Sequence, residues 1–104
     1  MKKLLAIATL VFSVGAVADE NIQVSNVRSF KIDGGSRVEG IAHNGSNATL
    51  RIVTVNFKLY DREGNVIGNA AAAAQDIAPG ENFKFAAFTT LDFAQAKLSS
   101  VDTM

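Results

Sequence analysis

The amino-acid sequence predicts an all-β protein, an antiparallel sandwich of six to seven short strands. Clusters of Gly, Pro, Asn and Asp recur roughly every eight to twelve residues and separate short apolar runs. The clearest run, residues 51–60, carries its larger apolar side chains at every second position: Val53, Val55, Phe57 and Leu59. Because successive side chains of a strand point to opposite faces, we expect this run to be a central strand with one buried face.

Residues 1–18 have the pattern of a secretory signal peptide. A basic start leads into a short apolar run, which ends in small residues up to Ala18. This pattern predicts cleavage between Ala18 and Asp19, followed by one domain over residues 19–104. The apolar run is short for a bilayer span, so we expect no stable membrane insertion after cleavage. The leader is typical of bacteria, which predicts a location in the periplasm or outside the cell.

Charge and cysteine content exclude several classes of function. Lys2 and Lys3 belong to the leader, so eight of the ten cations remain against ten carboxylates, a formal charge of −2. These cations are scattered singly, which argues against nucleic acid and against docking on an anionic membrane. The chain has no cysteine, which excludes disulfides, thiol chemistry and a lipid-modified cysteine.

The segment before the central strand predicts two strands. Apolar residues between positions 22 and 32 change phase around Asn26, which indicates one strand with a bulge or two short strands. A Gly-rich turn over residues 33–36 follows; it lacks the lysine and helix of a phosphate-binding loop. Residues 37–43 predict the next strand, in which Gly40 requires a backbone or an aromatic ring packed close to it.

The loop after this strand contains two N-x-S/T triplets, starting at Asn44 and Asn47. They are glycosylation acceptors in a eukaryotic secretory protein and turn residues in a bacterial one, and the bacterial leader favours the turn. His43 stands beside this loop. A single histidine at a strand end is expected to be a surface or hydrogen-bonded residue, because a metal site needs three or four ligands.

The segment after the central strand begins with a hairpin turn, residues 61–65. A rival interpretation of this turn is a calcium loop with ligands from Asp61, Glu63 and Asn65, but the acidic residue that closes such a loop is missing. We therefore expect no metal and no cofactor. The alanine run, residues 70–74, favours a helix by propensity and a strand by its flanking turns; we expect a strand of small side chains.

The last part of the chain predicts two further strands. Pro79-Gly80 is a type II turn pair, and residues 82–88 alternate as a strand behind it. Residues 91–96 suit either one helical turn or a bend. We expect residues 97–101 to close the sheet and residues 102–104 to form a tail.

At Phe57-Lys58-Leu59-Tyr60-Asp61 the chain resembles the bacterial FxLYD-domain family. Further positions that are similar to that family are Val38-Glu39-Gly40, Asn44, Gly64 and Pro79-Gly80. The likeness covers about residues 24–102 and implies an immunoglobulin-like β-sandwich, similar also to the desiccation-related LEA type. It implies no enzymatic activity. The residues that define it are expected to be structural: Phe57, Leu59, Tyr60, Asp61 and Gly64.

No constellation of side chains predicts a chemistry. The sequence offers no nucleophile with a base beside it. It also offers no pair of carboxylates at a spacing that indicates acid–base catalysis, so we expect no catalytic residue and no enzyme. We expect a non-catalytic exported module that binds a protein, a peptide or an envelope polymer, because an open sandwich keeps edge strands that accept an extended segment. The alternative is a structural or stress-protective LEA-like envelope protein without a specific partner.

Overall fold

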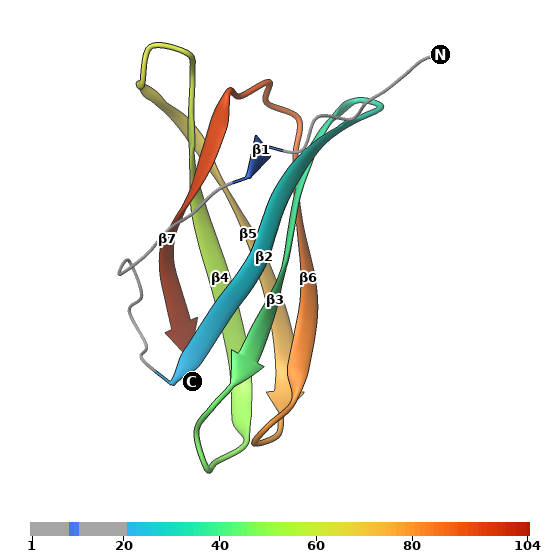
Figure 1. The fold of residues 1–104 in the computed structure, drawn as a ribbon, viewed down its shortest axis with the longest axis vertical. Coiled ribbons are helices and arrows are strands. Elements are labelled where there is room, and N and C mark those ends of the chain that lie inside the picture. Colours follow the sequence, from blue (N-terminus) through green and yellow to red (C-terminus); the bar gives the residue numbers. More distant parts are fainter. Residues whose placement is uncertain (1–8, 11–20) are drawn as a thin grey trace.

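A computed structural model describes residues 9–10 and 21–104, which form two antiparallel sheets packed face to face (Figure 1). Sheet A has the strand order β1-β2-β3-β6, and sheet B has the order β5-β4-β7. The strands are β1 (Thr9–Leu10), β2 (Ile22–Ile32), β3 (Gly35–Asn44), β4 (Leu50–Tyr60), β5 (Val66–Ile77), β6 (Asn82–Thr89) and β7 (Gln95–Thr103). The predicted all-β sandwich is confirmed. The predicted cleavage between Ala18 and Asp19 lies outside the described residues.

The strand order has the topology of an immunoglobulin-like sandwich. Neighbours β2, β3 and β6 correspond to strands A, B and E of that fold, and β5, β4 and β7 correspond to C′, C and F. Consecutive strands β5 and β6 belong to different sheets and lie next to each other along one side of the sandwich (Figure 1). On the opposite side β2 and β7 are the outermost long strands of their sheets.

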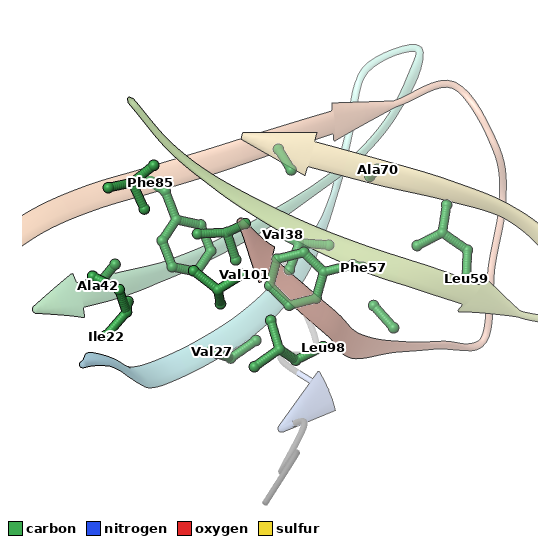
Figure 2. Packing of buried hydrophobic residues seen from close by; sticks show 14 of the residues in the cluster. Ile22, Val27, Val38, Ala42, Phe57, Leu59, Ala70, Phe85, Leu98 and Val101 are labelled. Atoms are coloured by element: carbon green, nitrogen blue, oxygen red, sulfur yellow. The ribbon is translucent and has the colours of Figure 1, made fainter. Parts of the chain in front are cut away.

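The core lies between the sheets and is built from every second residue of each long strand (Figure 2). On β4 the buried positions are the four that the alternation predicts: Val53, Val55, Phe57 and Leu59. The ring of Phe57 lies 5.7 Å from that of Phe85, centroid to centroid, so β4 and β6 meet across the sandwich through a pair of aromatic rings. The central-strand prediction is confirmed.

Gly40 of β3 supports this packing from the facing sheet. A Cβ atom at this position would collide with the ring of Phe85, which is only 3% exposed. Phe85 is the register partner of Gly40 on the neighbouring strand, and the Cζ and Cε atoms of its ring fill the space that a Cβ would take. The predicted aromatic contact at Gly40 is confirmed, and it explains why a residue that weakens a strand is tolerated here.

A bulge divides β2 into two parts, which confirms the phase change expected at Asn26. The register with β3 shifts between Ser25 and Arg28, and Asn26 has a φ of 56°. Before the bulge Ile22 faces the core, and after it Val27 and Ser29 do. The bulge thus allows both parts of the strand to bury a side chain in spite of the change of phase.

The alanine run is a strand, as its flanking turns predicted. Residues 70–74 lie in β5 and pair with β4, with Ala70 opposite Phe57. At both ends glycines adopt the left-handed region: Gly64 with a φ of 86° and Gly80 with a φ of 83°. The N–H of Glu81 donates to the carbonyl of Ala78, which closes the turn predicted at Pro79-Gly80.

The prediction that residues 102–104 form a tail is wrong. β7 continues to Thr103, and the N–H of Met104 donates to the carbonyl of Ile52 at 3.0 Å, while the N–H of Arg51 donates to the carbonyl of Met104. The end of the chain is therefore part of sheet B. The segment that suited a helical turn or a bend forms bends, and β7 already begins at Gln95.

Candidate interaction surface

The residues that carry the FxLYD resemblance lie at the end of β4 and in the turn behind it. Phe57 and Leu59 are fully buried. Tyr60 lies on the outer face of sheet B, where the Nζ of Lys97 is 5.2 Å from its ring centroid. Gly64 closes the hairpin, and its N–H donates to the carbonyl of Asp61. Each of these residues thus has a place in the packing or in the turn.

The carboxylate of Asp61 holds the hairpin turn together. Its Oδ1 accepts the backbone N–H groups of Glu63 and Asn65, each at 2.9 Å, and its Oδ2 accepts the side-chain amide of Asn65. The N–H of Asn65 is the main cause that lowers the pKa of Asp61 below its ordinary value of 3.8. Both carboxylate oxygens serve the turn, which does not favour the rival calcium loop.

The opposite end of the sandwich is organised by Asn44, a role that the sequence did not reveal. This side chain is fully buried, and its amide donates to the carbonyls of Ala48 and Ile77, both at 2.9 Å. Its Oδ1 accepts the N–H and the hydroxyl of Ser46. The N–H of Asn44 itself donates to the carbonyl of Glu81. One residue therefore ties together the loops at this end of the two sheets.

His43 next to it is hydrogen-bonded, as expected for a single histidine at a strand end. Its Nδ1 lies 2.7 Å from Oδ1 of Asn82, its register partner on β6. Among the described residues no three His, Asp or Glu side chains gather as metal ligands. The same part of the chain contains no helix that could cross a membrane.

The outer face of sheet B is polar and built from small side chains. Its centre is Asn56 of β4, whose amide donates to the hydroxyl of Ser100 and to Asp102 on β7. On the other side β5 contributes Ala71 and Ala73. Large apolar groups are exposed at the ends of this sheet: Val66 at the start of β5 is 55% exposed, and Met104 after β7 is 79% exposed. The centre of the face offers little apolar area to a partner.

The outer face of sheet A is different, because aromatic and cationic side chains lie in register across three strands. Phe30 of β2 is opposite Arg37 of β3, and Arg37 is opposite Phe88 of β6. Directly opposite residues in antiparallel strands share a face and lie about 5 Å apart. Phe88 is 63% exposed, and Ile32, two residues beyond Phe30, is 37% exposed. We call Arg28, Phe30, Ile32, Arg37 and Phe88 the aromatic row.

Two guanidinium groups flank the ring of Phe30 in this row. The Cζ atoms of Arg28 and Arg37 lie 5.4 and 5.6 Å from the ring centroid, within the range of cation–π attraction. The Nε of Arg37 is 2.7 Å from Oε2 of Glu39, but the two atoms meet without hydrogen-bond geometry. The ion pair with Glu39 and the contact with the Phe30 ring hold Arg37 in place on this face.

The aromatic row occupies only half of sheet A. Beyond the bulge at Asn26 the same face carries Gln23, His43 and Asn82, which are register neighbours. A cluster of exposed apolar groups and arginines beside a polar area has the composition of a protein interface, in which aromatic and Arg side chains are enriched. The fold defines the class of protein: an all-β antiparallel sandwich.

Comparison with known proteins adds one relative. No protein-family model and no solved structure matches the chain. An uncharacterized protein of Methanocaldococcus jannaschii is 35% identical over 48 residues, a match that covers 46% of this chain and 36% of that protein. The chain thus spans about a third of the length of this relative, whose description assigns no activity.

Proposed function

We propose that this chain is a non-catalytic, exported β-sandwich module that binds a polypeptide through the outer face of sheet A. The observation that carries the proposal is the aromatic row, above all Phe88, which remains 63% exposed on a strand whose other apolar side chains are at least partly buried. An exposed Phe between the edge of a sheet and an Arg is a typical anchor residue of protein interfaces.

Further support comes from the polar groups. In the described residues the ionisable side chains lie singly or in surface pairs, such as Lys31 with Asp92 and Arg37 with Glu39. The buried Asn44 is saturated by hydrogen bonds within the protein. An active site needs polar side chains that converge on one point and are free to contact a substrate. The arrangement of these residues therefore suits binding better than catalysis.

The resemblance to the FxLYD-domain family belongs to the same proposal. We propose membership on the strength of Phe57, Leu59, Tyr60, Asp61 and Gly64, together with the immunoglobulin-like strand order. The predicted leader, residues 1–18, supports export to the periplasm or beyond. No cofactor is part of this function.

The test is affinity capture from an envelope extract with three forms of the exported protein. The unmodified protein and Val66→Ala should capture one recurrent, saturable partner, and Phe88→Ala should lose it by about tenfold or more. Val66 is the matched control, because it is a similarly exposed apolar residue on the other sheet. Both substitutions are at the surface, and each should change the free energy of unfolding by no more than about 0.5 kcal/mol.

Equal capture by Phe88→Ala and the unmodified protein would reject the aromatic row as the binding surface. Scattered weak partners that do not saturate with any form would favour the alternative, a structural or stress-protective envelope protein without a specific partner. The two outcomes are distinguishable because only the first retains a saturable partner.

A further inference from the structure

The outer edge of β2 is already occupied by a strand. β1 pairs with it antiparallel, with Thr9 opposite Ser29 and Leu10 opposite Arg28. In Figure 1 this short strand lies beside the half of β2 that carries the aromatic row. An edge that pairs with an extended segment of its own chain has its backbone N–H and C=O groups accessible and suitably oriented for a strand.

The occupant belongs to the segment that the sequence predicts to be removed. Cleavage after Ala18 separates Thr9 and Leu10 from the domain, and it leaves this part of the β2 edge without its strand partner. Unpaired edges of sheets recruit other extended chains unless they are blocked. The exported protein therefore differs from its precursor at one particular edge.

We propose that the β2 edge from Val27 to Ile32 is a strand-acceptor site for an extended, predominantly apolar segment of a partner protein. Thr9 and Leu10 occupy part of this site, and the partner segment adds antiparallel to β2 once they are removed. This inference rests on the proposed function and specifies its mode of binding: backbone hydrogen bonds along β2 for affinity, and side-chain contacts on the outer face for specificity.

The other edges of the sandwich are less suited to strand addition. β5 and β6 lie next to each other where the two sheets meet, so each limits access to the other. β7 is interrupted by a bulge, because its register with β4 shifts at Ser99, between Leu98 and Ser100. Bulges of this kind interrupt strand pairing at sheet edges. On β2 the pairing with β3 is regular from Arg28 to Ile32, beyond the bulge at Asn26 and Val27.

Side chains around the site define the chemistry of the partner segment. A strand added to β2 extends the aromatic row by one position, beside Phe30, and in the precursor Leu10 stands opposite Arg28. Arg28 and Arg37 supply two positive charges on this half of the face, and Glu39, which is opposite Arg28 and pairs with Arg37, offsets one of them. A segment with apolar residues and a carboxylate opposite Arg28 fits both properties, since opposite charges across a strand pair attract.

The test uses the protein recovered after export and a synthetic peptide of residues 5–14 with a neutral polyethylene glycol tail. We expect saturable binding, with every second backbone amide between Val27 and Ile32 gaining protection from hydrogen exchange, because alternate N–H groups of an edge strand point outward. The matched control is the same peptide with Leu10→Pro, which lacks a ladder donor and should bind about tenfold or more weakly. A peptide with Leu10→Glu should bind about two- to fivefold more tightly.

Three results would overturn the strand-acceptor site: no binding at millimolar peptide, equal binding of the Leu10→Pro peptide, or protection on β5, β6 or β7 in place of β2. These failures are separate from failure of the proposed function. If Phe88→Ala loses the saturable partner and the peptide does not bind, the outer face of sheet A remains the proposed binding surface and strand addition to β2 is rejected. Capture that is indifferent to Phe88 would reject the face.

Discussion

Truncation of Phe57 to alanine should remove a large share of the stability of the protein. Phe57 is fully buried at the centre of β4 and packs against the ring of Phe85 at 5.7 Å. Burial of this kind makes Phe→Ala substitutions cost about 3–5 kcal/mol. A domain of roughly 85 residues has about 4–13 kcal/mol of stability in total. Phe57→Ala should therefore lose a large share of the free energy of unfolding, and the chain has no disulfide to limit the unfolded state.

Urea unfolding, followed by circular dichroism, measures this effect. With an m-value of about 1 kcal/mol/M, the midpoint of Phe57→Ala should fall by about 3–5 M, which places it near zero if the unmodified protein lies at the lower end of that stability range. Phe57→Leu keeps much of the volume and should cost about 1–1.5 kcal/mol, a shift that can be measured by the same assay.

Lys58→Ala is the matched control on the same strand. Lys58 points to the opposite face, is exposed, and stands directly opposite Lys97, so its removal also relieves a like-charge pair. Its free energy of unfolding should stay within about 0.5 kcal/mol of the unmodified protein. A Phe57→Ala protein that unfolds at the unmodified midpoint but loses a partner would refute the assignment of Phe57 to the core.

Further predictions concern the two ends of the sandwich, the glycine in β3 and the leader. Gly40→Ala should cost about 1–3 kcal/mol in urea unfolding, because the new methyl group meets the buried ring of Phe85; an unchanged midpoint would contradict the close contact. Asn44→Ala should lower the free energy of unfolding by about 1–3 kcal/mol, since its hydrogen-bond partners are left unsatisfied, and thermal unfolding measures the loss. The lowered pKa of Asp61 means that its contribution is present above pH 3.8 and is lost as the pH falls through the lower folded-state pKa. The difference in stability between Asp61→Asn and the unmodified protein should accordingly shrink on acidification, as a series of urea titrations between pH 2 and pH 6 would show. Mass spectrometry of the exported protein should find Asp19 at the N-terminus, and an intact leader would argue against the signal peptide.

The faces of the strands could be predicted from the sequence because alternation is a local property. Val53 and Phe57 fall on the buried face simply through the period of two, and the phase change at Asn26 marks the bulge. The alanine run was also correctly placed, since the turns on either side outweigh helix propensity over so few residues.

What could not be predicted depends on contacts between distant segments. Asn44 looked like a turn residue, but its partners include Ile77, which only the folded chain brings within reach. The aromatic row needs the register of β3 with both β2 and β6, and no local pattern specifies that Arg37 stands between Phe30 and Phe88. The pairing of Met104 with β4 likewise depends on how far β7 extends along its neighbour.

The bulge at Asn26 also limits self-association. Long, flat, regular edges template the growth of cross-β fibres, in which one chain after another adds to the last. On β2 the regular segment runs only from Arg28 to Ile32, a length of about 17 Å, and the bulge with the left-handed backbone of Asn26 interrupts it. If this edge accepts a strand as proposed, its short length suits one added segment and does not suit the growth of a fibril.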